Sequence, residues 1–306
     1  MPDQVSPLSG LWIPLITPFA YGRLDKASVE RLIEHFLNAP VDGLILGATT
    51  GECLTLDEFE LGELVAVAAK SVGGKVPLYL GLSGSNTKAL VSTAKHTGQW
   101  PIDGYLISCP YYSRPSQRGL KQHFSAIAGA TERPIVLYNI PYRTGVNLLN
   151  ETILELAEFP NIIGLKDCCT DQNQTFELLQ RKPSDFSVMT GEDVHYYSAL
   201  AHGAEGAILA SAHIETAKFA AVCERLVAGD AMGALRQWCE IADLTRLLFA
   251  EPSPAAIKYW LWRKGLIGSP ELRLPMTDVS PSLAAEINRA MAATEGLRET
   301  ERVAGV

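Results

Sequence analysis

Short apolar segments alternate along the chain with longer amphipathic ones. The short segments are rich in β-branched residues and apolar at nearly every position, as strands buried on both faces are. They lie at residues 11–17, 43–48, 77–83, 104–110, 134–140, 162–167, 187–191 and 206–211. The longer segments have helical periodicity and lie at residues 26–37, 56–71, 87–97, 120–129, 151–158, 175–181, 194–202 and 215–228.

This alternation predicts an α/β protein with a parallel sheet covered by helices. About eight such units before residue 230 match the size of a (β/α)8 TIM barrel. A doubly wound open sheet is the structural alternative. No G-x-G-x-x-G follows the first strand, which disfavours that alternative.

From residue 230 onward the pattern contains helices only. They are predicted at 230–250, 254–264 and 281–293, and Pro252 and Pro254 separate the first from the second. We therefore predict a barrel at 1–229 that carries the active site, followed by a small helical C-terminal domain at 230–306. The last residues, 295–306, are expected to be frayed.

Charge and composition disfavour several classes of partner. The formal net charge of the 306 residues is -8, and no run of Lys and Arg appears, which disfavours nucleic acid. A single Arg can still hold an anionic small substrate. No apolar stretch reaches the length of about 18 residues that a membrane span needs, and residues 1–4 lack the features of a signal peptide. A cytoplasmic protein without a membrane partner is expected.

The cysteine and histidine patterns predict neither disulfides nor a metal site. None of the six cysteines forms a C-x-x-C pair, and Cys168 and Cys169 are adjacent, which is poor geometry for a disulfide. A reduced chain follows. None of the six histidines forms H-x-x-x-H or H-E-x-x-H, which disfavours a zinc-dependent aldolase. No cofactor is expected.

Lys166 is a cation at the end of an apolar strand, where the active site of a barrel lies. Removal from water lowers the pKa of an ammonium group. The freed amine can then attack a ketone carbonyl and form a Schiff base. The alternatives are a lysine paired with Asp167 and a lysine whose head reaches solvent.

Two neighbouring strand ends carry further candidate groups. Tyr138 could move protons to and from the reacting lysine, or it could be an interior aromatic with a hydrogen-bonded tip. Thr49 and Thr50 lie between Gly47 and Gly51, which let the backbone bend and present N–H groups to a carboxylate. The alternative for this segment is a plain strand-to-helix turn with threonine capping.

Arg143 follows Pro141 in a predicted loop after the fifth strand. A guanidinium group suits bidentate binding of a substrate carboxylate. A surface arginine is the alternative. His213, after the last strand, could line the site or be an ordinary histidine at the edge of the core.

These segments together resemble one known family. Gly-Ala-Thr-Thr-Gly-Glu at 47–52, Tyr-Asn-Ile-Pro at 138–141 and Gly-Leu-Lys-Asp at 164–167 resemble the dihydrodipicolinate synthase / N-acetylneuraminate lyase family. The similarity runs over nearly the whole chain and includes residues 110–117 and 274–276. It implies a (β/α)8 barrel with a helical C-terminal domain, assembled as a homotetramer of tight dimers.

The resemblance also implies roles for individual residues. Lys166 matches the lysine that forms an imine with pyruvate, and Tyr138 matches the tyrosine that transfers protons. Thr49 and Tyr112 match a proton relay in which the tyrosine comes from the neighbouring subunit. Thr50 matches a residue that binds the carboxylate of pyruvate. Gly191 and Ile208 match residues that line the pyruvate pocket.

The second substrate follows from Arg143. In the synthases of the family this arginine binds the carboxylate of aspartate semialdehyde, so the expected reaction is its condensation with pyruvate in lysine biosynthesis. One alternative is another pyruvate-dependent aldolase or dehydratase, such as a sugar-acid or N-acetylneuraminate lyase. Another is a non-catalytic barrel that only binds a keto acid. Where bacterial synthases bind lysine as an inhibitor, this chain departs from the family and carries Cys53, Leu54, Glu58 and Leu61, although Asn86 and Tyr111 remain. The sequence therefore leaves inhibition by lysine open.

Overall fold

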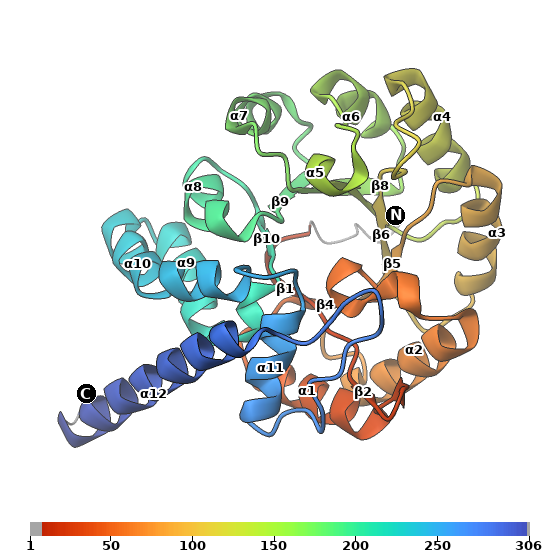
Figure 1. Cartoon of the computed structure of the whole chain (residues 1–306). Coiled ribbons are helices and arrows are strands. Elements are labelled where there is room, and N and C mark those ends of the chain that lie inside the picture. The colour runs from red at the N-terminus through yellow and green to blue at the C-terminus, as the bar shows by residue number, and fades with distance from the viewer. Residues whose placement is uncertain (1–7, 305–306) are drawn as a thin grey trace.

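The computed structural model describes residues 8–304, and side chains as far as residue 294. Within this range eight parallel strands form a closed barrel in the order β1-β10-β9-β8-β7-β6-β5-β4. Figure 1 shows the strands around a central axis with helices outside them. Because β1 pairs with both β4 and β10, the sheet has no open edge. The predicted TIM barrel is confirmed and the open sheet is excluded.

The barrel strands agree with the predicted segments in number and order. Their bounds are β1 Gly10–Pro14, β4 Gly43–Leu46, β5 Leu78–Leu82, β6 Gly104–Ser108, β7 Ile135–Asn139, β8 Ile162–Asp167, β9 Ser187–Thr190 and β10 Gly206–Ile208. A two-stranded hairpin that the sequence did not reveal comprises β2 Phe19–Ala20 and β3 Arg23–Leu24. Several predicted strands extend too far because their last residues leave the ladder and enter the loops at the barrel mouth.

Helices cover the outside of the barrel. Those before residue 230 are α1 Lys26–Leu37, α2 Glu58–Val72, α3 Thr87–Thr97, α4 Gln117–Ala128, α5 Pro141–Thr144, α6 Asn150–Leu156, α7 Gln172–Arg181, α8 Tyr196–Ala201 and α9 Thr216–Val227. Side chains cap several N-termini; in α2, Asp57 and Glu60 form a reciprocal capping box. Four short 3₁₀ turns lie at the barrel mouth: η1 Thr49–Gly51, η2 Cys53–Thr55, η3 Asp193–His195 and η4 Ser211–His213.

The C-terminal helices are α10 Ala231–Leu248, α11 Ala255–Arg263 and α12 Pro281–Ala304. In Figure 1, α10 lies beside α9, and α12 runs away from the barrel. The expectation that 295–306 are frayed is wrong for residues 295–304, which continue α12. Glu, Leu, Arg and Ala dominate this stretch and favour helix. Residues 305–306, like the N-terminal residues 1–4, lie outside the described part. The two-domain division at 229/230 stays a prediction.

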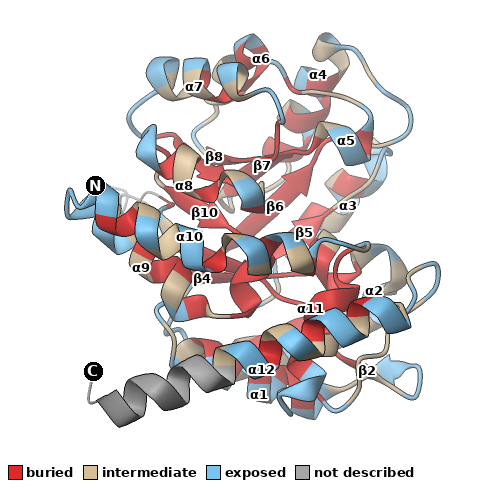
Figure 2. Ribbon diagram, turned by 60° about the vertical axis from the view of Figure 1, so that its left-hand side comes forward, coloured by how far each residue is buried: buried red, intermediate tan, exposed pale blue. Residues whose placement is uncertain are grey.

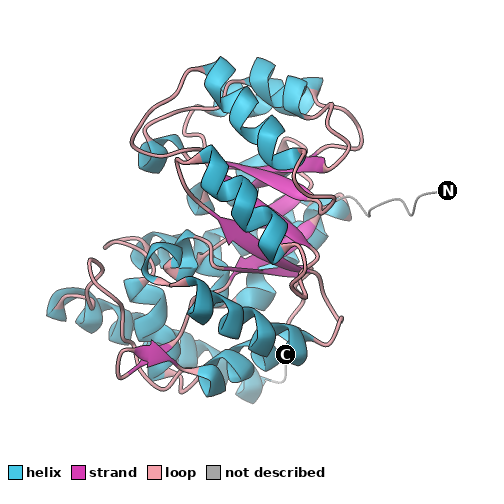
Figure 3. Ribbon diagram, turned by 90° about the vertical axis from the view of Figure 1, so that its right-hand side faces the viewer, coloured by secondary structure: helices cyan, strands magenta, loops and turns pink. Residues whose placement is uncertain are grey.

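Apolar side chains fill two separate layers. The larger one lies between the barrel and its helices, where the inner faces of the helices are buried (Figure 2). The smaller one fills the barrel interior with Leu8, Trp12, Ile45, Ala48, Tyr79, Leu106, Val136, Tyr138, Ile140, Cys168, Met189 and Ile208. Figure 3 shows the strands enclosed by helices on both sides. Inward-facing residues therefore alternate with residues that pack on the helices, as in a filled barrel.

No helix in residues 8–304 combines the length and the apolar character that a membrane crossing needs. All six cysteines are free thiols.

Candidate active site

Lys166 lies in β8 with only 5% of its surface exposed. Its neighbour Asp167 accepts hydrogen bonds from the Thr175 hydroxyl (2.5 Å) and the Cys169 N–H (3.0 Å) instead. None of the ion pairs recorded for residues 8–294 includes Lys166. Burial therefore lowers the pKa of the Lys166 amine, and nearby anionic groups only oppose this shift. Both alternatives, a pair with Asp167 and a head in solvent, are excluded.

Tyr138 lies directly opposite Lys166 on the adjacent strand β7, since the two residues are register partners. The Lys166 Nζ lies 4.4 Å from the centre of the Tyr138 ring. Burial raises the pKa of the Tyr138 phenol well above its usual value, and a hydrogen bond with Thr49 offsets this only in part. The phenol is therefore protonated at neutral pH, and its hydroxyl contacts Thr49.

The turn after β4 brings Thr49 and Thr50 to the same place. Gly47 takes a φ of +59°, which favours glycine, and η1 follows directly. Gly51 is not in the left-handed region. Its hydrogen atom faces the Leu15 carbonyl, where a Cβ would lie 2.9 Å from the oxygen, and its own carbonyl accepts a hydrogen bond from Thr17. The left-handed residue that ends the turn is Glu52, with a φ of 54°.

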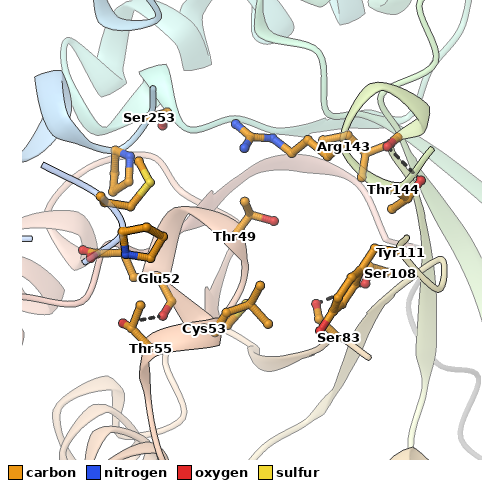
Figure 4. Close-up of a pocket in the computed structure, with 15 residues that line it drawn as sticks. Thr49, Glu52, Cys53, Thr55, Ser83, Ser108, Tyr111, Arg143, Thr144 and Ser253 are labelled. Atoms are coloured by element: carbon orange, nitrogen blue, oxygen red, sulfur yellow. Dashed lines mark hydrogen bonds between the residues drawn. The ribbon is translucent and has the colours of Figure 1, made fainter. Parts of the chain in front are cut away.

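Arg143 lies in the one-turn helix α5, so the prediction of a loop at this position is wrong. Pro141 at the first helical position has the φ that a helix needs, and Gly145, with a φ of +78°, ends the turn. The guanidinium group lies 5.9 Å from the centre of the Tyr142 ring. Figure 4 shows the Arg143 side chain extending above Thr49, with its guanidinium group toward Ser253.

One cavity, which we call the lysine cavity, joins most of these residues. Its lining comprises Thr49, Thr50, Tyr138, Ile140, Tyr142, Arg143, Lys166, Gly191, Glu192, Asp193, Ala210, Phe249 and Ser253. Six of the eight site residues expected from the sequence therefore meet here. Ile208 does not line the cavity: it is 1% exposed and packs with Tyr138 in the barrel interior.

Tyr112 is the other residue that the structure leaves outside the lysine cavity. Its side chain is 94% exposed, and its φ of 70° lies in the left-handed region. Its N–H donates to the Thr144 carbonyl at 3.1 Å, which holds this strained residue beside α5. Within one chain, Tyr112 therefore does not reach Thr49.

His213 is a structural histidine. Its Nε2 accepts the Ile16 N–H at 3.2 Å and its Nδ1 lies 2.8 Å from the Ala210 carbonyl oxygen. These contacts tie the end of β10 to the segment after β1. Burial lowers the pKa of His213 to about 4, so the ring is neutral at neutral pH. Of the two interpretations of the sequence, the core-edge histidine is confirmed.

The structure adds polar groups to the cavity that the sequence did not single out. The Asp193 carboxylate accepts two hydrogen bonds from Ser211, one from the backbone N–H at 2.7 Å and one from the side-chain hydroxyl at 2.5 Å. Burial raises the pKa of Asp193 to about 6. Glu192 has one carboxylate oxygen, and Ser253 its hydroxyl, buried without a hydrogen-bond partner among the described residues. Glu192 and Asp193 directly follow the strand predicted at 187–191. Ser253 and Phe249 lie in the predicted C-terminal domain, where no motif in the sequence indicated that residues would reach the site.

A second hollow, the outer cavity, continues from the lysine cavity and has a volume of about 290 Å³. Thr49, Arg143 and Ser253 line both cavities, and Figure 4 shows them among the residues around the outer cavity. Its other walls include Leu54 and Met276. Leu54 is 69% exposed, so this side of the site presents apolar surface to the outside.

The chemistry available in the lysine cavity is that of a nucleophilic amine. Burial favours the neutral form of Lys166, Tyr138 supplies a protonated phenol beside it, and Arg143 supplies a cation for an anionic substrate. No group of three or more His, Cys, Asp or Glu residues in the described part of the chain is arranged to hold a metal ion.

Comparison with known proteins adds independent information. Residues 7–294 match the sequence profile described as the dihydrodipicolinate synthetase family. The chain is 44% identical over 282 residues to 4-hydroxy-tetrahydrodipicolinate synthase 2 of Clostridium acetobutylicum, and the match covers 92% of this chain and 99% of that protein.

Solved structures agree with this match. The 4-hydroxy-tetrahydrodipicolinate synthase of Methylacidiphilum fumariolicum SolV superposes with a TM-score of 0.92 at 32% identity, covering 96% of this chain and 99% of that one. The chloride-inhibited dihydrodipicolinate synthase of Acinetobacter baumannii, complexed with pyruvate, gives a TM-score of 0.89 at 32% identity and covers 93% and 98%.

Proposed function

Because the chain belongs to the dihydrodipicolinate synthetase family, we propose that it is a Schiff-base-forming lyase with 4-hydroxy-tetrahydrodipicolinate synthase activity. It condenses pyruvate with aspartate semialdehyde, a step of lysine biosynthesis. The observation that carries this proposal is the buried Lys166, without an ion-pair partner in residues 8–294 and in contact with Tyr138 inside a cavity that Arg143 also lines.

Lys166 begins the reaction. Its neutral amine attacks the ketone carbon of pyruvate, and loss of water from the resulting carbinolamine gives an imine. Loss of a proton from the pyruvate methyl group then gives an enamine, whose carbon attacks the aldehyde carbon of the second substrate, and the aldehyde oxygen takes up a proton. The amino group of aspartate semialdehyde then attacks the resulting imine, which closes the ring and releases the Lys166 amine. Burial lowers the pKa of Lys166, which raises the fraction of the amine that can react at neutral pH.

Tyr138 moves the protons that these steps require. Carbinolamine formation and water loss each need a proton donor near the Lys166 nitrogen, and the Tyr138 phenol lies beside that atom. Thr49 contacts the phenol and continues the relay toward the outer cavity. Tyr112 of a second subunit completes it, since within one chain Tyr112 projects outward.

The turn after β4 and the floor of the lysine cavity bind pyruvate. Thr50, 7% exposed, provides polar groups for the carboxylate from the end of β4. Gly191 leaves room beside Lys166, because any Cβ there would collide with the lysine side chain. Ile208 supports the apolar floor with Tyr138. A small keto acid fits these groups better than a large one.

Arg143 binds the carboxylate of the aldehyde substrate. It is exposed and lines both cavities, so its guanidinium group can meet a substrate that enters from outside while pyruvate already occupies Lys166. A planar guanidinium group suits bidentate carboxylate binding. This assignment distinguishes the synthase from a sugar-acid lyase of the same family.

Assembly and location follow from the same proposal. A homotetramer of tight dimers would cover Tyr112 and Leu54, which one chain leaves 94% and 69% exposed beside the outer cavity. Free thiols at all six cysteines fit a reducing cytoplasm. No cofactor or metal ion is proposed, and lysine is not proposed as an inhibitor.

The Schiff base is tested by reductive trapping. The protein is incubated with pyruvate and borohydride, and its intact mass and the modified peptide are measured. We expect one reduced pyruvate adduct per chain on Lys166, and none in Lys166→Met or when pyruvate is omitted. Absence of an adduct in the unmodified chain would refute the proposed mechanism.

The aldehyde is tested separately by coupled assays with pyruvate and a panel of aldehydes. We expect turnover with aspartate semialdehyde and little with sugar-derived aldehydes. Arg143→Gln should raise the KM for aspartate semialdehyde by roughly 10- to 100-fold, since a charged hydrogen-bonded contact contributes about 1.5–3 kcal/mol, while the trapping of pyruvate stays unchanged. Turnover confined to sugar-derived aldehydes would instead identify a sugar-acid lyase.

A further inference from the structure

An ion pair between Lys258 and Glu52 is completely enclosed by protein. The side chains are 0% and 1% exposed, and the two residues are 206 positions apart in the chain. Glu52 directly follows η1, the turn that carries Thr49 and Thr50, and Lys258 lies in α11. The pair therefore joins the C-terminal helices to the turn that forms one wall of the lysine cavity.

The Glu52 carboxylate and the Lys258 amine each make a second polar contact with the C-terminal region. The second carboxylate oxygen of Glu52 accepts a hydrogen bond from the backbone N–H of Arg273 at 3.0 Å. The Lys258 amine also donates to the backbone carbonyl of Glu271 at 2.8 Å. The Lys258 Nζ lies 4.3 Å from the centre of the Phe19 ring, and the Arg273 guanidinium lies 4.1 Å from the same centre. The Glu52 carboxylate is thus held from two segments of the C-terminal region.

The backbone of Glu52 gives this link a mechanical consequence. With a φ of 54°, Glu52 is in a conformation that a residue with a Cβ rarely adopts. Its N–H donates to the Thr49 carbonyl at 3.1 Å, closing the turn. A strained residue persists only where its surroundings hold it, and here the side chain is the part that is held. Loss of the ion pair would let Glu52 relax and carry Thr49 with it.

Stability alone is a poor explanation for such a pair. Burial lowers the pKa of Lys258 to about 8, although Glu52 opposes the shift, so burial disfavours the charge that the pair requires. Apolar residues of similar volume often replace a buried ion pair without loss of stability. A salt bridge does, however, specify one distance and one direction between the segments that it joins.

We propose that Glu52 and Lys258 are positioning residues, which hold the turn bearing Thr49 and Thr50 at the distance from Lys166 that the reaction needs. The inference rests on the proposed function. It goes beyond it in giving α11 a role in the reaction, because Lys258 acts on the turn through Glu52 and does not line the lysine cavity. A displacement of a reactive group by about 1 Å can cost roughly 100-fold in rate, so a small movement of the turn would be visible in kinetics.

The test uses the double variant Glu52→Gln/Lys258→Met, which removes both charges together and leaves no buried ion alone. We expect a folded protein with a roughly 10- to 100-fold lower kcat/KM for pyruvate. At saturating pyruvate, borohydride should still trap Lys166, because the amine itself is unchanged. Hydrogen exchange of the amides at residues 47–55 should accelerate, while exchange in the β7 and β8 strands stays at the wild-type rate.

The matched control is Lys182→Met/Glu205→Gln. This pair, at 2.6 Å with side chains 10% and 28% exposed, lies at the opposite end of the barrel. We expect a comparable change in thermal stability from it but no change in the KM for pyruvate or in exchange at residues 47–55. A purely structural role for Glu52 and Lys258 would make the two double variants behave alike.

Glu52→Asp provides a second test if the double variant does not fold. It keeps the charge but shortens the link by one methylene group, so it should still raise the KM for pyruvate and the exchange rate at 47–55. Unchanged values of both in a folded variant would overturn the inference. If the wild-type chain forms no imine, the proposed function fails, while the exchange comparison still decides whether the pair holds the turn.

Discussion

Tyr138 and Lys166 occupy partnered positions on the adjacent parallel strands β7 and β8, and the Lys166 Nζ lies 4.4 Å from the centre of the Tyr138 ring. Tyr138 therefore makes two different contacts. Its ring lies against the Lys166 amine, which makes a cation–π contact whenever the amine is protonated. Its hydroxyl contacts Thr49. In the proposed reaction, the first contact orients the amine and the second connects the phenol to the proton relay.

Tyr138→Phe separates these two contacts, because it keeps the ring and removes the hydroxyl. We expect kcat to fall by about 100- to 10,000-fold, the range typical of a lost general acid–base group. Trapping of Lys166 by pyruvate and borohydride should become slower yet still reach completion. Trapping reactions quenched at successive times measure this rate and its end point directly. A wild-type kcat in Tyr138→Phe would remove Tyr138 from the proton relay.

Gly191→Ala tests whether the position of the Lys166 side chain limits the reaction. A Cβ at residue 191 would collide with the Lys166 Cε and the Cys168 Sγ. The lysine end is the flexible partner, so we expect it to move while the barrel stays folded. The kcat/KM for pyruvate should drop by roughly 100-fold, and stability should fall by about 1–3 kcal/mol because the buried Cys168 must also shift.

The control for this substitution is Gly62→Ala in α2. There the new Cβ would lie 3.6 Å from the Trp100 ring, an ordinary contact, and alanine is favoured over glycine within a helix. We expect wild-type kinetics and slightly higher stability. Equal activity in the two variants would mean that Lys166 tolerates displacement.

Periodicity predicted the barrel because strand and helix patterns are local and recur along the chain. The carboxyl ends of parallel strands all meet at one end of the barrel, and this placed Lys166, Tyr138 and the 49–50 pair near each other before any contact was known. Ser253 and Phe249 could not be found in this way. They enter the lysine cavity only because the α10–α11 connection folds over the barrel mouth, and no local pattern encodes that long-range packing.

His213 predicts an acid-dependent loss of stability. Its folded-state pKa of about 4 lies below the ordinary value of 6.5. As the pH falls through 6.5 toward 4, the unfolded chain binds a proton that the folded chain does not. Stability from the neutral ring is thus complete above pH 6.5 and is lost on acidification, by about 3 kcal/mol for this group alone.

Urea unfolding of wild type and His213→Gln at pH 7.5 and pH 4.5 measures this contribution. The variant should be less stable at pH 7.5, by about 1–3 kcal/mol, because the Ile16 N–H loses its acceptor. At pH 4.5 the gap should shrink or reverse. Other titrating groups, such as Asp193, largely cancel in this difference. A gap that is the same at both pH values would contradict the low pKa.

Tyr112 predicts that activity can be restored by mixing two inactive proteins. In the proposed tight dimer, the site around Lys166 of one subunit uses Tyr112 of the other, as its 94% exposure within one chain suggests. Lys166→Met lacks the nucleophile, and Tyr112→Phe lacks the relay hydroxyl in its partner's site. A mixed dimer of the two contains one site with both Lys166 and a complete Tyr112, and one site with neither.

The two variants are therefore mixed in equal amounts, dissociated, reassociated and assayed. Random pairing makes about half of the dimers mixed, each with one complete site, so roughly one quarter of wild-type activity should return. If Tyr112 acted within its own chain, every chain would lack one group and no activity would return. The double variant Lys166→Met/Tyr112→Phe mixed with wild type is the control: its mixed dimers have no complete site, so pairing should lower activity below that of the wild-type chains alone.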